Sequence, residues 1–169
     1  MIVWLIGLSG SGKTTIGNAL YEELKTKHKN TVFLDGDVFR NIMGNDLGHS
    51  EEDRLKNAHR VSHFCKYMDD HGINVVAAIL SSFPEWQKWN RDNFHQYFEV
   101  FVDTSMDTLE KRDIKDLYRR AHKGEIKNVV GVDIQFPIPN ADLTIDNNEN
   151  LLDISPQVRK IIAALPEFT

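Results

Sequence analysis

The N-terminal part of the chain carries glycines, a lysine and a threonine at the spacing of a phosphate-binding loop. Residues 7–14, Gly-Leu-Ser-Gly-Ser-Gly-Lys-Thr, match the pattern G-x-x-x-x-G-K-[ST] at every fixed position. Glycine lets the backbone curl until successive N–H groups point at one anion, and a helix that follows directs its positive end to the same place. The pattern therefore predicts a site for the phosphates of a nucleoside triphosphate.

Two side chains of this loop have specific expected roles. Lys13 is expected to face solvent at the ligand site and to reach the β- and γ-phosphates, while the Thr14 hydroxyl is suited to bind Mg²⁺. The alternative is a glycine-rich turn between a strand and a helix that binds no ligand. The apolar run 2–6 before the loop and the amphipathic segment after it favour the triphosphate site.

A pair of carboxylates follows the short apolar run 31–34. Asp37 is the candidate for accepting the proton of an attacking hydroxyl, because ligands bind at the carboxyl ends of parallel strands. The alternative is that Asp35-Gly36-Asp37 is a polar turn without a catalytic role. The triplet alone does not decide between these two interpretations.

Three arginines and a basic segment add positive charge further along the chain. Arg40 and Arg54 are suited to bidentate binding of a phosphate or sulfate, whereas a solvated helix charge is the favoured interpretation of Arg60. Residues 112–123 are strongly basic and lack a strong apolar face, so they could form a mobile lid over the transferring phosphate. A surface helix with many charges is the other interpretation.

Histidines and tryptophans in the middle of the chain raise the question of a metal or substrate site. His59 and His63 lie four residues apart on an expected helix, a spacing at which two imidazoles can bind zinc. No third ligand stands at a recognisable spacing, which disfavours a metal site. Trp86 and Trp89 are expected to pack in the core rather than to line a substrate cleft.

Strands and helices are expected to alternate, which is typical of an α/β fold with a parallel sheet between helices. The expected strands are 2–6, 31–34, 73–80, 98–103 and 142–146. The expected helices are 15–28, a long one that Ser50 caps and that ends near Gly72, then 84–95, 105–112 and a C-terminal one.

Composition limits the class of protein. A length of 169 residues suits a single domain over residues 1–169, and a net charge of −5 leaves no large positive field, so nucleic acid is not an expected partner. Cys65 is the one cysteine, which excludes a disulfide within a monomer and fits a reducing compartment. The apolar run 2–6 is too short to span a membrane, so we expect a cytoplasmic protein without a membrane partner.

Several segments in one order resemble the adenylylsulfate (APS) kinase family, over about residues 2–146. They are the loop 7–14, Leu34-Asp35-Gly36-Asp37, Asp46-Leu47-Gly48, Ser50-Glu51-Glu52-Asp53-Arg54, Val102-Asp103-Thr104 and Lys123-Gly124-Glu125-Ile126-Lys127-Asn128. The resemblance implies a P-loop kinase fold, a three-layer α/β/α sandwich with a mainly parallel sheet and a lid at about 112–127. It also implies ATP with Mg²⁺ as the donor and the ribose 3′-hydroxyl of a small-molecule nucleotide as the acceptor.

The resemblance also implies site residues, position by position. Asp37 takes the place of the catalytic aspartate, and Lys13 is the second catalytic residue. The residues expected at ATP are Gly7, Ser9, Gly10, Ser11, Gly12, Lys13, Thr14, Thr15 and Arg112, with Thr14 at the magnesium ion. The residues expected at the acceptor are Asp37, Arg40, His49, Arg54, Asn57, Ser81, Lys127 and Val129.

Departures from the family bear on the acceptor. APS kinases have phenylalanines at the positions of His49 and Val129, and these two rings clamp the adenine of the acceptor. The family's Ser-Pro-aromatic-Arg stretch is Ser81-Ser82-Phe83-Pro84 in this chain, without the arginine. A site that keeps its phosphate-binding arginines but lacks the purine clamp suits a smaller pyrimidine base.

The favoured acceptor is therefore cytidine diphosphoramidate, which a variant within the family phosphorylates in the modification of a bacterial capsular polysaccharide. The alternative is APS, phosphorylated to 3′-phosphoadenylylsulfate in sulfate activation. An alternative of another class is a regulatory module that binds ATP without chemistry, which the retained Lys13, Thr14 and Asp37 disfavour. A homodimer is compatible with the sequence, which does not determine the oligomeric state.

Overall fold

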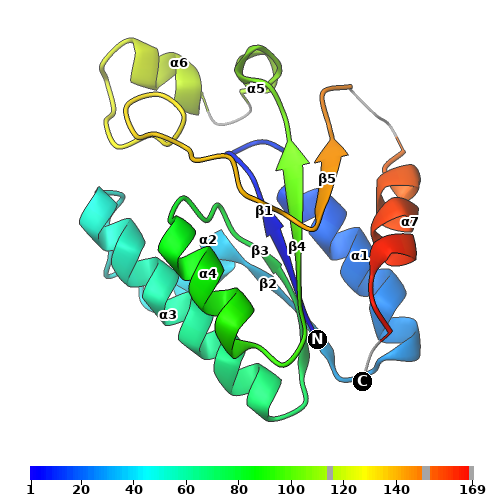
Figure 1. Cartoon of the computed structure of the whole chain (residues 1–169). Helices are drawn as coiled ribbons and strands as arrows, with labels where there is room; N and C mark the ends of the chain where they lie inside the picture. The colour runs from blue at the N-terminus through cyan, green and yellow to red at the C-terminus, as the bar shows by residue number, and fades with distance from the viewer. Residues whose placement is uncertain (114–115, 150–152, 168–169) are drawn as a thin grey trace.

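The computed structural model describes residues 1–113, 116–149 and 153–167 of the chain, in which strands alternate with helices (Figure 1). The strands are β1 (Ile2–Ile6), β2 (Thr31–Asp35), β3 (Asn74–Ala78), β4 (Tyr97–Asp103) and β5 (Leu143–Asp146). The helices are α1 (Lys13–Lys27), α2 (Gly36–Ile42), α3 (Glu51–Asp70), α4 (Pro84–Asn93), α5 (Met106–Arg112), α6 (Leu117–His122) and α7 (Ser155–Ala164).

The described strands form one sheet in the order β2-β3-β1-β4-β5, and every pair is parallel. Strand β1 is central, with Ile2 aligned to Val75 of β3 on one side and to Tyr97 of β4 on the other. All residues of β1 are buried, because helices cover both faces of the sheet. The predicted α/β/α sandwich with a parallel sheet is confirmed.

Alternate side chains of β1 enter two separate apolar layers. Val3 packs in a cluster with Leu20 of α1 and Ile161 of α7. On the opposite face, Trp4 packs in a cluster with residues that include Val61 of α3. In Figure 1, α1 and α7 accordingly lie on one side of the sheet, and α3 and α4 lie on the other.

Two helix starts differ from the sequence prediction in ways that matter for the site. Helix α1 begins at Lys13 rather than near Thr15, so the last residues of the phosphate loop form the first helical turn. Helix α2, which was not predicted, follows β2 directly because the Asp35 carboxylate accepts bonds from the N–H groups of Asp37 (2.9 Å) and Val38 (3.4 Å). The triplet Asp35-Gly36-Asp37, for which a polar turn was the alternative interpretation, is thus the capped beginning of a helix.

The predicted cap of the long helix α3 is confirmed. Ser50 Oγ accepts a hydrogen bond from the Asp53 N–H at 3.2 Å, which supplies a partner for one of the free N–H groups of the first turn. The helix ends before Gly72, whose φ of +69° lies in the left-handed region that glycine tolerates. Among the described helices, none combines the length and the apolar character needed to cross a membrane.

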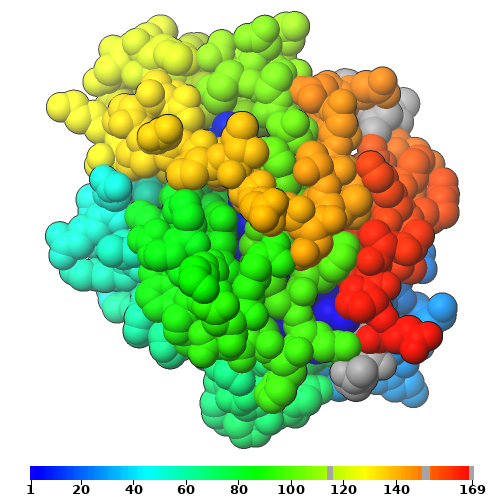
Figure 2. Space-filling model, viewed as in Figure 1, coloured from blue at the N-terminus to red at the C-terminus, as the bar shows by residue number. Residues whose placement is uncertain are grey.

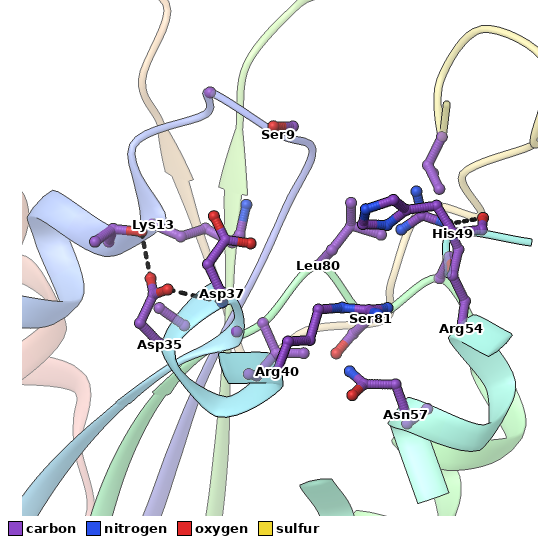
Figure 3. Close-up of a pocket in the computed structure, with 18 of the residues that line it drawn as sticks. Ser9, Lys13, Asp35, Asp37, Arg40, His49, Arg54, Asn57, Leu80 and Ser81 are labelled. Atoms are coloured by element: carbon purple, nitrogen blue, oxygen red, sulfur yellow. Dashed lines mark hydrogen bonds between the residues drawn. The ribbon is translucent and has the colours of Figure 1, made fainter. Parts of the chain in front are cut away.

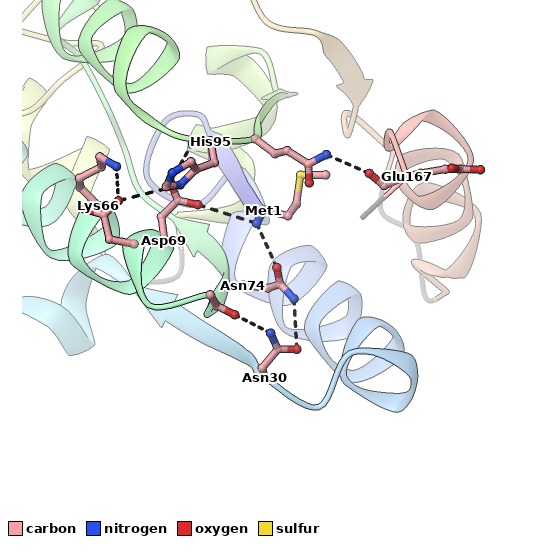
Figure 4. Close-up of polar contacts among 10 residues, drawn as sticks. Met1, Asn30, Lys66, Asp69, Asn74, His95 and Glu167 are labelled. Atoms are coloured by element: carbon pink, nitrogen blue, oxygen red, sulfur yellow. Dashed lines mark hydrogen bonds and ion pairs between the residues drawn. The ribbon is translucent and has the colours of Figure 1, made fainter. Parts of the chain in front are cut away.

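The end of the sheet remote from the phosphate loop is held by a polar cluster (Figure 4). Buried Asp69 of α3 accepts a bond from the His95 N–H at 2.8 Å, and its carboxylate lies 2.9 Å from His95 Nδ1. Asn74 Oδ1 accepts a bond from the Met1 amino group at 3.0 Å. These contacts join α3 to the beginnings of β1, β3 and β4, while the predicted site residues gather at the opposite end.

Candidate active site

A cleft of about 1000 Å³ opens at the carboxyl ends of the strands. In the space-filling view, the yellow segment after α6 overhangs the cyan and green ends of α3 and α4, and part of the blue N-terminal segment is visible between them (Figure 2). The predicted residues that line the cleft are Ser9, Gly10, Gly12, Lys13, Thr14, Thr15, Asp37, Arg40, His49, Arg54, Asn57, Ser81, Arg112, Lys127 and Val129. The structure therefore brings most of the predicted site together.

The phosphate loop encloses the Lys13 side chain. Lys13 Nζ donates to the carbonyl oxygen of Leu8 at 2.7 Å and lies 3.5 Å from Ser11 Oγ. Lys13 is only 9% exposed, so the expectation that it faces solvent was wrong. These contacts hold the ammonium group inside the loop, where phosphate oxygens would meet it.

Gly7 and Ser11 do not line the cleft but shape the loop. A Cβ atom on Gly7 would lie 2.7 Å from the carbonyl oxygen of Val102, which requires glycine at this position. The carbonyl oxygen of Ser11 accepts bonds from Asn147 Nδ2 (2.7 Å) and from Thr104 Oγ1 (3.3 Å). Sequence reasoning missed Asn147, which follows β5 and lies far from the loop in sequence.

Thr14 and Asp35 together form an oxygen-rich corner of the cleft, in which Asp35 lies beside Asp37 (Figure 3). Thr14 Oγ1 donates to Asp35 Oδ2 at 2.7 Å, and the other carboxylate oxygen of Asp35 caps α2. A hydroxyl and a carboxylate in contact are ligands of the type that Mg²⁺ prefers, so these residues fit the ion. Asp35 was not among the predicted site residues, although its place after an apolar run was a usable signal.

Asp37 and Arg40 lie on α2, which the Asp35 cap places at the edge of the cleft. In Figure 3 the Asp37 carboxylate points to the same part of the cleft as Lys13. Arg40 Nη1 donates to the carbonyl oxygens of Leu47 (3.2 Å) and Gly48 (3.0 Å), and burial lowers the pKa of its guanidinium, which Asp37 partly offsets. A carboxylate and a guanidinium thus face one cavity, as transfer of a phosphoryl group to a hydroxyl would require.

Arg54 joins the beginning of α3 to the segment that follows α6. Its Nε donates to the carbonyl oxygen of His49 at 2.9 Å, and its Nη2 donates to that of Asn128 at 2.8 Å. Among the described residues, the hydrogen bonds of Arg40 and Arg54 go to carbonyl oxygens rather than to carboxylates. Their positive charges therefore remain available for an anionic ligand.

Burial and the neighbouring Arg54 and Arg40 lower the pKa of His49 below its ordinary value of 6.5. Its imidazole is therefore neutral at neutral pH and offers a flat ring to a ligand. Val129 also lines the cleft but is only 4% exposed, since it packs with Leu109 and Tyr118.

The lid segment, residues 112–127, differs from its prediction in one respect. Ile114 and Lys115 lie outside the described residues. In the rest of the segment, Tyr118 is buried and packs with Leu109 and Val129, so the segment does have apolar anchors. The predicted lack of an apolar face was wrong, because Leu117, Tyr118 and Ala121 of α6 and Ile126 after it all pack in the same apolar cluster.

Charged residues of the lid also contact the rest of the molecule. Arg112 lines the cleft and its Nη2 donates to the carbonyl oxygen of Glu149 at 2.7 Å. Lys127 lines the cleft and is exposed. Both cations can therefore approach an anionic ligand from the side of the lid.

The aromatic and histidine residues on α3 and α4 form a surface cluster. The His59 and His63 rings stack with centroids 4.1 Å apart, and His59 meets the edge of Trp86 at 5.2 Å. In the described part of the chain, the geometry of a three-residue metal site occurs at Asp69, Asp70 and His95, not at His59 and His63. Trp86 lines the cleft, contrary to the expectation of a purely core role.

Two further sequence interpretations concern single residues. Arg60 forms an ion pair with Asp46 at 2.7 Å on the surface and does not line the cleft, which agrees with a solvated helix charge. Ser81 follows β3 with a φ of +50°, which is uncommon for a residue other than glycine. Its hydroxyl oxygen accepts a bond from Trp4 Nε1 at 2.8 Å, a contact that the sequence alone did not indicate.

Comparison with known proteins identifies the family to which this site belongs. A sequence model described as adenylylsulphate kinase matches residues 1–146. The chain belongs to the adenylylsulfate kinase family. Members of this family are phosphotransferases, and the cleft of this kinase contains the phosphate loop, the acidic residues and the arginines that such a reaction uses.

The relatives of this kinase are named after two different phosphoryl acceptors. A cytidine diphosphoramidate kinase from Campylobacter jejuni is 46% identical over 147 residues, which cover 87% of this chain and 86% of the relative. An adenylyl-sulfate kinase from Marinobacter nauticus is 38% identical over 169 residues, which cover 98% of this chain and 84% of the relative. The solved structure of the Mycobacterium tuberculosis APS kinase CysC in complex with AMPPNP and APS has a TM-score of 0.84 at 34% identity, covering 96% of this chain and 95% of that one.

Proposed function

We propose that this kinase transfers the γ-phosphoryl group of ATP to the ribose 3′-hydroxyl of cytidine diphosphoramidate. The observation that carries the proposal is that His49 and Val129 line the cleft where two phenylalanine rings would hold an adenine. Stacking on an aromatic ring contributes about 1–3 kcal/mol per base in nucleic-acid-binding proteins, so a purine would lose much affinity here. A neutral imidazole and a small aliphatic side chain suit a smaller base.

The proposed chemistry assigns a task to each group. Asp37 accepts the proton of the 3′-hydroxyl while the 3′-oxygen bonds to the γ-phosphorus and ADP leaves with the electrons of the broken P–O bond. Lys13 holds the negative charge of the transferring group, and Arg40 and Arg54 orient the diphosphate part of the acceptor. Thr14 and Asp35 would hold Mg²⁺, which neutralises phosphate charge when bound.

The 46% identical relative from Campylobacter jejuni, a cytidine diphosphoramidate kinase, supports the same acceptor. The family resemblance stated for the sequence implies that the product would serve in the modification of a capsular polysaccharide, and we expect the enzyme to work in the cytoplasm. APS is the second candidate, because Arg40, Arg54, Asn57 and Lys127 all line the cleft and the solved structure with APS is similar over nearly the whole chain.

A panel of acceptors tests the proposal. Cytidine diphosphoramidate, CDP and APS are each offered with ATP and Mg²⁺, and the products are identified by mass while ADP release gives kcat/KM. We expect the highest kcat/KM for cytidine diphosphoramidate, at least about tenfold above APS. A preference for APS would restore the sulfate-activation assignment, and the absence of acceptor-dependent ADP release would favour a non-catalytic ATP-binding module.

A further inference from the structure

The cleft continues past Ser81 to a group of uncharged side chains between the sheet and the helices α3 and α4. We call this group the inner pocket, and it consists of Trp4, Asn57, Ser62, Trp86, Gln87 and Asn90. Ser81 connects it to the rest of the cleft, since Trp4 donates to its hydroxyl oxygen at 2.8 Å and Gln87 Nε2 donates to its carbonyl oxygen at 3.0 Å. The inner pocket is therefore continuous with the proposed acceptor site.

The inner pocket differs from the outer cleft in charge. The lysines and arginines that line the cleft are Lys13, Arg40, Arg54, Arg112 and Lys127, and they come from the phosphate loop, α2, the beginning of α3 and the lid segment. The inner pocket contributes only amides, a hydroxyl and indole rings. A second anionic group would find no described cation there, whereas a neutral polar group would find hydrogen-bonding partners.

Two buried side-chain oxygens of inner-pocket residues have no hydrogen-bond partner among the described residues. They are Ser62 Oγ and Asn90 Oδ1, on residues that are only 1% and 2% exposed. Buried polar atoms are nearly always paired in native proteins, because an unpaired buried acceptor is destabilising. A ligand that brings an N–H donor would supply the missing partner.

The neighbouring tyrosine supplies no hydrogen bond to the Asn90 side-chain oxygen. Tyr97 uses its single hydroxyl proton on Glu99 Oε2 at 2.6 Å, and Glu99 in turn lies 3.5 Å from the guanidinium of Arg91. Burial raises the pKa of the Tyr97 hydroxyl, and the Asn90 side chain lies close enough to this hydroxyl to lower that pKa in part. Because the Tyr97 proton is used on Glu99, it is not available to Asn90 Oδ1, which has no hydrogen-bond partner among the described residues.

We infer that the inner pocket binds an amino group of the acceptor nucleotide, and that Asn90 is a specificity-determining residue that accepts its hydrogen bond. The inference rests on the proposed function and deepens it. A phosphoramidate carries N–H donors on its terminal phosphorus, whereas the sulfate of APS carries only acceptor oxygens. If the phosphoramidate is the group bound, the acceptor oxygens of a sulfate in its place would leave Asn90 Oδ1 unpaired, and the inner pocket would select against sulfate.

Cytidine diphosphoramidate has two amino groups of this kind, one on the terminal phosphorus and one on the cytosine ring. Both are N–H donors, and three nucleotide substrates distinguish which of them is bound. CDP retains the cytosine amine and lacks the phosphoramidate nitrogen, uridine diphosphoramidate does the reverse, and cytidine diphosphoramidate has both. We compare kcat/KM for these three substrates between the wild-type enzyme and Asn90→Leu. Leucine has a similar volume but no hydrogen-bond acceptor, so the substrates that lose most identify the group that Asn90 binds.

The expected result is a selective loss. If Asn90 binds the phosphoramidate nitrogen, Asn90→Leu lowers kcat/KM for both diphosphoramidates at least about tenfold more than for CDP. If it binds the cytosine amine, the larger loss falls on the two cytidine acceptors. Either pattern supports the inference. Ser62→Ala should change the ratio of kcat/KM values among the three substrates in the same direction as Asn90→Leu.

Gln157→Leu is the matched control. Gln157 lies on α7, is buried, has an unpartnered Oε1 and does not line the cleft, so its replacement should leave all acceptor ratios unchanged. Equal changes for all three acceptors in a folded Asn90→Leu protein, or none, would overturn the inference. A wild-type enzyme that does not phosphorylate cytidine diphosphoramidate would instead contradict the proposed function itself.

Discussion

The hydroxyl group of Tyr118 in α6 donates a hydrogen bond to the carbonyl oxygen of Ser9 in the phosphate loop, at 2.7 Å. Burial raises the pKa of Tyr118 to about 12, so the hydroxyl keeps its proton at every pH at which the enzyme can be assayed. The contact ties the lid segment directly to the loop that would hold the triphosphate.

Replacing Tyr118 by phenylalanine should therefore weaken ATP binding. The hydrogen bond contributes about 1 kcal/mol, which corresponds to a rise of about fivefold in the KM for ATP with a smaller change in kcat. Tyr67→Phe is the control, because Tyr67 is 60% exposed on α3 and does not line the cleft. Steady-state kinetics that give both variants the same KM would show that the contact does not position the loop.

Lys13→Ala should lower kcat by at least about a hundredfold, because the ammonium group stabilises charge that develops on the transferring phosphoryl group. Since Lys13 is buried in the loop, the variant must be shown to fold, by circular dichroism and thermal unfolding. Lys25→Ala on the same helix is the control, since Lys25 pairs with Glu22 on the surface. Wild-type turnover in a folded Lys13→Ala protein would contradict the assigned role.

Asp37→Asn and Asp35→Asn should have different kinetic effects. Asp37→Asn removes the proton acceptor, so we expect a large fall in kcat with little change in the KM for ATP. Asp35→Asn should instead raise the Mg²⁺ concentration needed for half-maximal activity, because the Asp35 carboxylate contacts Thr14 Oγ1 and asparagine can still cap α2. Titrations of ATP and of Mg²⁺ for both variants measure these effects. If Asp37→Asn raised the Mg²⁺ requirement and Asp35→Asn lowered kcat, Asp37 would be the metal-binding residue and Asp35 the proton acceptor.

His49→Phe combined with Val129→Phe should shift the ratio of kcat/KM toward APS, because two rings restore a platform for adenine. Val129 is buried against Leu109 and Tyr118, so a larger side chain there costs about 1–3 kcal/mol of stability. His49→Phe alone is therefore measured as well, together with thermal unfolding of each variant. An unchanged ratio in folded variants would mean that other residues select the base.

The His49 imidazole should titrate below pH 6.5 in the free enzyme, since burial, Arg54 and Arg40 all lower its pKa. Because the unfolded chain takes up this proton first, the neutral form stabilises the fold above about pH 6.5, and this contribution is lost as the pH falls through the folded pKa. NMR titration of the histidine ring signals, with His49→Phe for assignment, measures the midpoint. A midpoint at or above 6.5 would contradict the described environment.

The sequence by itself determined the features that depend on neighbouring residues. The phosphate loop is a contiguous run whose glycines and helix start define its backbone, so roles for Lys13 and Thr14 could be predicted without a structure. The alternation of apolar runs and amphipathic segments was enough for the parallel α/β architecture. The start of α2 was missed because the Asp35 cap could equally belong to a turn.

Only the tertiary structure decided which distant residues meet in the cleft. Tyr118 reaches Ser9 across 109 positions, and Asn147 reaches Ser11 across 136, because β1, β4 and β5 are neighbours in the sheet and α6 lies over the loop. The unpartnered Oδ1 atom of Asn90 likewise becomes visible only when α4 packs against the sheet. Sequence periodicity describes contacts within a few residues along one element, whereas these contacts depend on strand order and on how the helices pack.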